Sequence, residues 1–272
     1  MNKQNQIIKI KEIELAFLKY FSNKNYKLVD IDLIEKLDWS HLTKEDLLQM
    51  KERNFWQNNN HIYSLRHDFT DQLLRYHSIF PTDFKKVAYS GPIVRNNEVI
   101  SQIGIENYLP IYNQFNDSFN DFYHFIKTYL KDDIQLIILG HYQLLNELLE
   151  EKYRTLVIKN MIEERNLSGL KHQLPHNHPI LKLLSESTRH QLSKLSQYLD
   201  QSSQTLLTVK SWEEQLIKQG LTNIHLDISA QPSRSYYKGV FIRCYLNKHD
   251  TSILTGGFYS GDLQGYGMAL TL

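Results

Sequence analysis

A short polar turn between two strand-like segments constrains the fold of this chain more than any other feature. Lys86–Val94 and Ser101–Tyr108 are rich in residues that favour β-structure, and Arg95–Glu98 joins them. Strands joined by so few residues pair in an antiparallel direction, because a parallel pair needs a crossover of roughly a dozen or more residues. The sheet that contains this hairpin is therefore antiparallel at this point.

Helical and strand-like segments alternate along the rest of the chain. Apolar residues spaced three or four apart predict helices, and alternating or continuously apolar runs predict strands. The predicted helices are Ile7–Phe21, Asp38–Met50, Phe69–Ile79, Phe119–Leu130, Tyr142–Glu150, Thr155–Asn166, Ile180–Leu199 and Gln204–Gln219. The predicted further strands are Lys27–Ile31, His61–Arg66, Ile134–Gly140, His225–Ile228, Tyr237–Leu246 and Ser252–Phe258. Gly265–Leu272 is an apolar segment, and Asn54–Asn60 is interpreted as a polar turn. The pattern is α+β: an antiparallel sheet with helices packed on it.

The composition is that of an ordinary globular protein. Of the 272 residues 41% are hydrophobic and 22% charged, and 31 Lys plus Arg balance 30 Asp plus Glu, so no broad nucleic-acid footprint is visible. No apolar run is long enough to cross a membrane, and no secretory signal is recognisable. The single cysteine, Cys244, excludes an internal disulfide and fits a reducing compartment. We expect a cytoplasmic protein without a membrane partner, folded as one domain over 1–272 with a helical insertion at about 151–202.

The common motifs for metal binding and nucleophilic catalysis are missing from the sequence. His172, His176 and His178 lie close together, but in a Pro/Asn segment without a carboxylate or cysteine partner, and we expect them to be exposed. There is no HExxH, CxxC or GxSxG motif, and neither of the common glycine-rich nucleotide-binding loops occurs. Cys244 lies within an alternating strand and is expected to be packed. We therefore predict no metal, no cofactor and no catalytic residue.

Polar residues on the strand-like segments remain as candidates for a binding site. Gln102 and Glu106 lie an even number of residues apart, so both project from one face of their strand, and Gly104 between them is expected to leave space above the sheet. Tyr236 and Tyr237 should face opposite sides if a strand begins there. The whole set suits a zwitterionic ligand, but it equally suits solvated surface ion pairs. Its members are Arg66, Asp68, Thr70, Arg95, Gln102, Glu106, Arg234, Tyr236, Tyr237 and Tyr259.

In this order, the segments resemble the catalytic core of histidyl-tRNA synthetases, which have a class II synthetase fold. They resemble most closely the paralogous family of regulatory subunits of short-form ATP phosphoribosyltransferase. The resemblance covers nearly the whole chain, including the helical segment around Glu163–Leu170. The matching motifs are Arg66–Thr70 for RPEGT, Val94-Arg95 for the motif 2 arginine, Gln102–Glu106 for QxGxE, Tyr236–Gly239 for YYTG and Gly256–Tyr259 for GGRY.

The resemblance implies a pocket for histidine. In this pocket Asp68 and Gln102 would meet the α-amino group, and Thr70 would contribute a hydroxyl. The imidazole would be surrounded by Glu106, Tyr237 and Tyr259. Two arginines, Arg95 and Arg234, are candidate contacts to a phosphate or another anion, although Arg234 lies two residues from the family's register, which falls at Pro232.

Departures from the synthetase pattern change the expected function. Leu272 stands where a synthetase places an arginine on the ATP phosphates, and an apolar side chain cannot neutralise phosphate charge. No anticodon-binding domain is expected, so tRNA is not an expected partner. The resemblance then implies a non-catalytic subunit whose partners are the catalytic subunit of short-form ATP phosphoribosyltransferase and histidine, its feedback effector. It also implies self-dimerisation near Ile10–Ile34 within a hetero-oligomer.

Two other functions stay open at this point. Arg95 and Glu98 are compatible with a residual synthetase-like ligase that activates an amino acid with ATP. Alternatively, the chain is an interaction scaffold whose pocket has decayed.

Overall fold

The computed structural model describes residues 3–37, 50, 53–79, 84–108, 113–232, 234–249, 252–261 and 263–272. Most of the helix predicted over 38–50 lies outside these residues. The chain forms two compact units. Unit 1 comprises Met1–Asp133, Lys248–Leu254 and Ser260–Leu272, and unit 2 comprises Ile134–Asn247 and Thr255–Tyr259.

The predicted hairpin forms the centre of unit 1. Strands β5 (Lys86–Arg95) and β6 (Glu98–Tyr108) pair in an antiparallel direction, with Arg95 opposite Glu98. The turn contains only Asn96 and Asn97, whose φ angles of 51° and 63° lie in the left-handed region that asparagine tolerates, as a type I′ hairpin turn requires. The hairpin prediction is confirmed, with a tighter turn than expected.

Two more strands extend this sheet. β1 (Lys27–Leu28) pairs in parallel with β5, and β11 (Gln264–Thr271) pairs in an antiparallel direction with β6, which gives the order β1-β5-β6-β11 in unit 1. The predicted strand at Lys27–Ile31 is thus real but much shorter.

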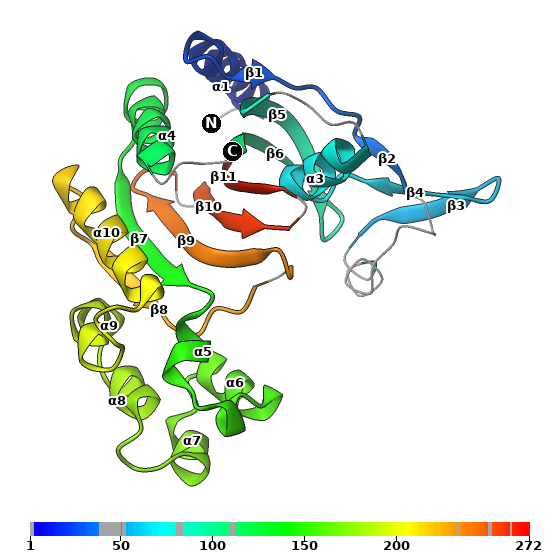
Figure 1. Ribbon diagram of the computed structural model, residues 1–272. Coiled ribbons are helices and arrows are strands. Elements are labelled where there is room, and N and C mark those ends of the chain that lie inside the picture. The colour runs from blue at the N-terminus through cyan, green and yellow to red at the C-terminus, as the bar shows by residue number, and fades with distance from the viewer. Residues whose placement is uncertain are drawn as a thin grey trace. The chain divides into compact units, whose positions relative to one another are not determined.

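Helices pack on both faces of this sheet. α1 (Lys3–Asn23) packs on β1, β5 and β6, and its Glu14 accepts a hydrogen bond from Ser101 (Figure 1). α3 spans Phe69–Ile79, as predicted, and its Thr70 contacts Glu106. Because Ser101 and Glu106 are an odd number of residues apart on β6, α1 and α3 cover opposite faces.

Aromatic rings form the core on the α1 face. α4 (Asn113–Phe125) continues as a π-helical turn, η2 (Ile126–Leu130), where one helix from Phe119 to Leu130 was predicted. The fully buried Phe17 and Phe21 of α1 pack against Phe122 and Phe125 of α4, with ring centroids 5.1–6.4 Å apart between the two helices. This cluster fixes α1 to α4.

A three-stranded sheet, in the order β2-β4-β3, precedes α3. Its strands are β2 (Ile34–Leu37), β3 (Phe55–Asn58) and β4 (His61–Leu65). The polar turn predicted over Asn54–Asn60 is therefore wrong, since only Asn59 and Asn60 form the turn and both have positive φ angles. Trp56 stacks across the strands on Tyr63, with ring centroids 5.9 Å apart, and this pair stabilises a short strand whose residues are all exposed.

Unit 2 contains β7 (Ile134–His141), β8 (Ile224–Asp227), β9 (Tyr237–Leu246) and the central residues of β10 (Ile253–Ser260), in the order β10-β9-β7-β8. β7 is antiparallel to β9 and parallel to β8. α10 (Gln204–Lys218) packs on β7 and β9 (Figure 1). As predicted, Gly220 follows this helix with a positive φ angle of 82°.

The segment predicted as a helical insertion is helical and belongs to unit 2 (Figure 1). The helix predicted over Ile180–Leu199 is interrupted, because the buried Gln191 amide donates to the main-chain carbonyls of Leu183 and Glu186 and ends α8 there. α7 was not predicted. The elements from Tyr142 onward are α5 (Leu144–Leu148), η3 (Glu151–Tyr153), α6 (Leu156–Glu163), α7 (Leu167–Gln173), α8 (Pro179–Ser185), α9 (Thr188–Lys194) and η4 (Leu195–Gln197).

Among the helices in the described parts of the chain, none is both long enough and apolar enough to cross a membrane.

Candidate functional site

The α3 face of the unit 1 sheet carries four of the predicted site residues. Glu106 on β6 is fully buried, and its Oε1 accepts a hydrogen bond of 2.5 Å from the Thr70 hydroxyl. Gln102 lies four residues before Glu106 on β6 and projects from the same face, and it is 4% exposed. Asp68 precedes α3 directly, so the structure places all of these side chains on or beside one helix and one strand.

The space expected above Gly104 is filled, and that prediction is wrong. Tyr89 lies opposite Gly104 on β5, and its ring covers the glycine so closely that a Cβ atom there would come within 2.4 Å of it. Burial, and next the negative charge of Glu106, raise the pKa of Tyr89 well above that of an ordinary phenol. The Tyr89 phenol is therefore uncharged at physiological pH, and its ring forms one side of the site.

Asp68 forms an ion pair with Arg95, the candidate anion contact in unit 1. Arg95 Nη2 donates to Asp68 Oδ2 at 2.9 Å, and Arg95 Nε donates to the carbonyl of His67 at 3.1 Å. The other carboxylate oxygen of Asp68 accepts the amide of Asp71 at 3.1 Å, at the start of α3. A ligand ammonium group at Asp68 would thus share its carboxylate with Arg95.

Arg66 is a structural residue. It is buried, and it donates to the carbonyls of Ile31 (2.8 Å) and Pro92 (2.9 Å). Its guanidinium also lies 3.9 Å from the ring centroid of Phe69, which stacks in turn on Tyr89 at 4.1 Å. These contacts hold the segment before α3 against β5, and they leave Arg66 no evident role toward a ligand.

The predicted site residues of unit 2 gather at the start of β9. This strand begins at Tyr237, so Tyr236 lies before it and the two rings are neighbours, 4.6 Å apart, rather than on opposite sides. The Tyr236 ring also meets the buried Tyr259 in an edge-on contact at 6.3 Å. Arg234 is buried, and its main-chain carbonyl accepts the amide of Tyr237.

His172, His178 and Cys244 lie within the described residues and differ in how deeply they are buried. The described residues contain no group of three or more His, Cys, Asp or Glu side chains that could hold a metal ion. His172 lies on α7, and His178 is buried and accepts the amide of Ile180 at the start of α8, so the prediction of an exposed His178 is wrong. Cys244 is fully buried, as predicted, and burial raises its pKa.

Tyr89 and Gly267 are contributors to the site that the sequence reasoning missed. Gly267 lies directly opposite Glu106 on β11. A signal for Tyr89 existed, since counting back from a two-residue turn at Asn96 and Asn97 pairs Tyr89 with Gly104. No comparable signal points to Gly267, because β6 and β11 are far apart in the sequence.

Known proteins resemble this chain in sequence over nearly its whole length. The family model described as histidyl-tRNA synthetase matches residues 3–270. An ATP phosphoribosyltransferase regulatory subunit of Staphylococcus epidermidis is 54% identical over 268 residues, which cover 98% of this chain and 99% of the relative. A protein of the same name from Staphylococcus aureus is 51% identical over 272 residues, the full length of both.

Solved structures share the fold at low sequence identity. A regulatory subunit/histidyl-tRNA synthetase from Bacillus halodurans has a TM-score of 0.78 at 17% identity, covering 97% of this chain and 77% of the other. An ATP phosphoribosyl transferase (HisG:HisZ) complex from Thermotoga maritima has a TM-score of 0.74 at 16% identity, covering 96% and 97%. Apo histidyl-tRNA synthetase of S. aureus has a TM-score of 0.57 at 17% identity, covering 96% and 67%.

These matches confirm the predicted class II synthetase-like α+β fold. The chain belongs to the family of ATP phosphoribosyltransferase regulatory subunits.

Proposed function

We propose that this chain is the non-catalytic regulatory subunit of a short-form ATP phosphoribosyltransferase and acts in the first step of histidine biosynthesis and in its feedback control. The observation that carries the proposal is the 51–54% identity, over 98–100% of the chain, to relatives that bear this name. The catalytic partner would join ATP and phosphoribosyl pyrophosphate. Leu272, in the place of the synthetase arginine, supports a role without adenylation.

Reconstitution with the short-form catalytic subunit tests this role. The catalytic subunit alone should form phosphoribosyl-ATP slowly, and adding this chain should raise the rate and make it sensitive to histidine. If this chain changes neither the rate nor the histidine sensitivity, the proposal is wrong.

Histidine is the effector that we propose for the candidate site. The fully buried Glu106 carboxylate, held by Thr70, suits an imidazole N–H, because burying an ionised carboxylate is costly unless donors surround it. Asp68 and Gln102 would receive the α-amino group. Tyr237 and Tyr259 are assigned to the imidazole by the family resemblance, and Arg95 and Arg234 to an anion such as the ligand carboxylate. Feedback then requires that histidine bind the inhibited complex more tightly than the active one.

Calorimetric titration with histidine tests the effector separately from the partner. Glu106→Gln should weaken binding by roughly 1–3 kcal/mol, because the buried group loses its charge. The matched control is Glu163→Gln, an exposed position on α6, which should leave affinity unchanged. Equal affinity of both variants and the parent chain would place the imidazole elsewhere.

The two alternatives predict different experimental outcomes. A residual ligase would catalyse histidine-dependent exchange between pyrophosphate and ATP, which we expect to be absent. A scaffold with a decayed pocket would activate the catalytic subunit yet bind no histidine.

We further propose that the chain dimerises within the complex and resides in the cytoplasm. Large apolar side chains are exposed along α1 and the segment after it, and such surfaces typically mark interfaces. They include Ile7, Ile8, Leu15, Leu28 and Ile34, which are 42–56% exposed. Ile8→Glu should shift the sedimentation of the protein from dimer to monomer, whereas a parent chain that sediments as a monomer would contradict the proposal.

A further inference from the structure

Both oxygens of the Asp68 carboxylate accept hydrogen bonds within unit 1. Oδ2 accepts Arg95 Nη2 at 2.9 Å, and Oδ1 accepts the main-chain amide of Asp71 at 3.1 Å. Arg95 is also held by the carbonyl of His67, to which its Nε donates at 3.1 Å. Two consecutive residues before α3 thus bind one guanidinium at the end of β5, so the charges of Arg95 and Asp68 meet in a defined geometry.

This ion pair is partly open to solvent. The side chains of Arg95 and Asp68 are 37% and 27% exposed, so a ligand can reach both charges. Ion pairs at such exposure contribute little to stability, because water competes for each partner. The pair can therefore exchange partners with a ligand without a large loss of stability.

Arg95 supplies the positive charge next to Asp68. Burial, and next the charge of Arg95, lower the pKa of the neighbouring His67, so the His67 ring is uncharged at physiological pH. Arg53, which also faces His67, is bound by Asp71. A ligand ammonium group that approaches Asp68 consequently meets the guanidinium of Arg95.

The charges of the ligand decide whether this meeting is favourable. An α-amino acid carries an ammonium group for Asp68 and a carboxylate for Arg95, so one ion pair is exchanged for two charge-assisted contacts. The corresponding amine has no carboxylate, and its ammonium group would be repelled by Arg95. The corresponding acid has no ammonium group, and its carboxylate would be repelled by Asp68.

We propose that the Asp68–Arg95 ion pair makes the candidate site selective for zwitterionic amino acids over the amines and acids that share their side chain. The proposal rests on the proposed binding of histidine, and it names the charge pattern that the ligand must carry. An imidazole ring without both the ammonium and the carboxylate group would then be a poor effector.

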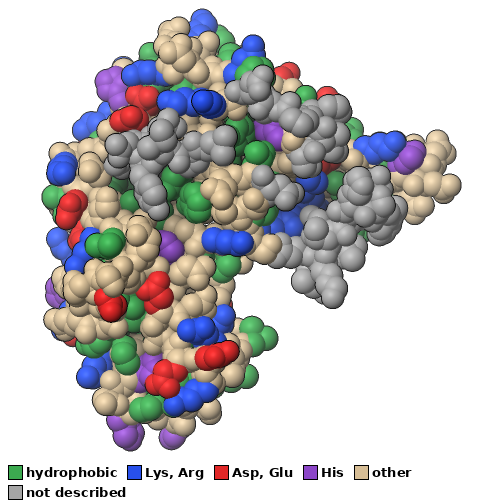
Figure 2. All heavy atoms as spheres, in the orientation of Figure 1, with side chains coloured by type: hydrophobic (Ala, Val, Ile, Leu, Met, Phe, Trp, Pro, Cys, Tyr) green, Lys and Arg blue, Asp and Glu red, His purple; other side chains and the backbone are tan. Residues whose placement is uncertain are grey.

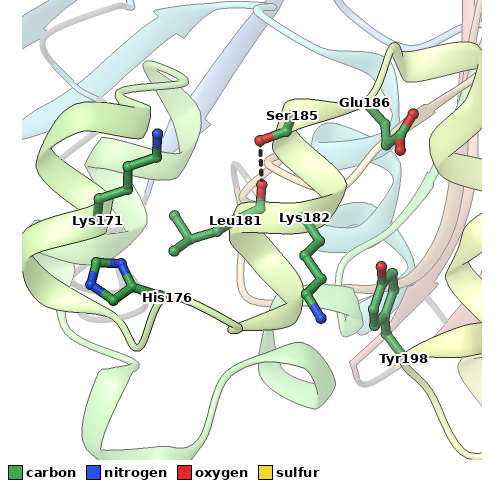
Figure 3. Close-up of a pocket in the computed structure, with 7 residues that line it drawn as sticks. All are labelled: Lys171, His176, Leu181, Lys182, Ser185, Glu186 and Tyr198. Atoms are coloured by element: carbon green, nitrogen blue, oxygen red, sulfur yellow. Dashed lines mark hydrogen bonds between the residues drawn. The ribbon is translucent and has the colours of Figure 1, made fainter.

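The pairing of opposite charges is a local feature of this site. On the face drawn in Figure 2, Lys and Arg side chains are interspersed with Asp and Glu, in keeping with a net charge of +1, so the overall charge favours neither sign of ligand. The hollow among α7, α8 and η4 has no comparable arrangement, because Lys171 and Lys182 of its lining point away from each other (Figure 3). Lys182 therefore serves as a control position for the loss of a positive charge.

Calorimetric titration with L-histidine, histamine and imidazolepropionate at about pH 7.5, where the imidazole rings are uncharged, tests the selectivity. The parent chain should bind histidine about tenfold or more tightly than either analogue. Arg95→Gln should weaken histidine binding about tenfold, yet strengthen histamine binding, because the repelling guanidinium is gone. Asp68→Asn should likewise weaken histidine binding but strengthen imidazolepropionate binding, and its Oδ1 can still accept the amide of Asp71.

These opposite changes separate selectivity from general damage, which would weaken every ligand alike. Lys182→Gln, an exposed position on α8, should leave all of these affinities unchanged. The proposed selectivity is wrong if histidine binds the parent chain but each variant shifts the affinities for histidine and for its analogue in the same direction. If histidine does not bind the parent chain, histidine is not the effector, and this proposal fails with it.

Discussion

Gly267 on β11 lies directly opposite Glu106 on the neighbouring strand β6, and the Glu106 carboxylate occupies the place where a side chain on Gly267 would stand. A Cβ atom on Gly267 would be 2.4 Å from Glu106 Oε2, far inside normal contact. The atoms that would have to move belong to the end of the Glu106 side chain, and this carboxylate also accepts the hydrogen bond from Thr70. The absence of a side chain at Gly267 therefore positions the buried carboxylate.

Gly267→Ala should consequently weaken histidine binding more than it weakens the fold. Displacing Glu106 should lower histidine affinity about tenfold or more, since a hydrogen bond to a charged group contributes about 1.5–3 kcal/mol. The free energy of unfolding should fall by only about 1 kcal/mol, the lower end for overpacking. Calorimetry and urea denaturation measure the two effects.

Gly140→Ala is the contrasting variant. Its Cβ atom would be 2.7 Å from the main-chain carbonyl of Asp227 and 2.3 Å from the Phe241 ring, so the backbone itself must move. We expect a loss of unfolding free energy of about 3 kcal/mol. Equal stability losses in the two variants, with histidine affinity retained in Gly267→Ala, would contradict this account.

Phe69→Ala should destabilise unit 1 strongly. Phe69 is 1% exposed and lies between the Arg66 guanidinium and the Tyr89 ring, so its removal leaves a cavity and separates both partners. A buried Phe→Ala change typically costs about 3–5 kcal/mol. Urea denaturation of Phe69→Ala beside Phe55→Ala, a half-exposed phenylalanine on β3, measures the difference. Similar losses for both would show that the stack contributes little.

Local sequence patterns predicted α3 at its observed bounds, and they predicted the β5–β6 hairpin with a longer turn than the structure has. α3 begins at Phe69 because Asp68 accepts a main-chain amide of its first turn, and the asparagine pair at 96–97 fixes the β5–β6 hairpin. These signals lie within a few residues of the elements that they define, so they can be recognised without knowledge of the tertiary structure.

Features that depend on distant contacts could not be predicted in this way. The break between α8 and α9 depends on the Gln191 side chain returning to the carbonyls of Leu183 and Glu186. Within the candidate site, the spacing of the QxGxE residues gives the shared face of Gln102 and Glu106. It does not show that Tyr89 fills the space above Gly104, because that depends on the register of the neighbouring strand.

Asp71→Asn should also destabilise unit 1, through an ion-pair network beneath α3. Asp71 accepts from the buried Arg53 and from Arg75, and Arg75 binds Glu35 of β2 through two hydrogen bonds of 2.6 and 2.7 Å. Burial opposes the charge on Arg75, but Glu35 and Asp71 outweigh it and raise its pKa.

Removing the Asp71 charge leaves Arg53, whose side chain is 3% exposed, without its carboxylate partner. The expected loss of unfolding free energy is about 3–5 kcal/mol. Asp117→Asn, an exposed position on α4, should change stability by about 0.5 kcal/mol or less. A loss no larger in Asp71→Asn than in this control would show that the network does not stabilise the fold.

Stability should fall in mildly acidic solution because of His141 at the end of β7. Burial, partly opposed by the charge of Glu147, lowers the pKa of His141 to about 4, and its Nδ1 accepts the amide of Gln143 at 3.1 Å, which requires a neutral ring. The histidine of the unfolded chain takes up a proton near pH 6.5, whereas His141 in the folded chain does so only near pH 4. The free energy of unfolding is therefore at its full value above about pH 6.5 and decreases as the pH falls toward about 4, by up to roughly 3 kcal/mol. Urea denaturation at about pH 7.5 and about pH 4.5 measures this decrease in unfolding free energy. His141→Gln should make the decrease smaller. His172→Gln, an exposed control on α7, should leave the decrease unchanged. The same decrease in parent and His141→Gln would assign the acid sensitivity to other groups.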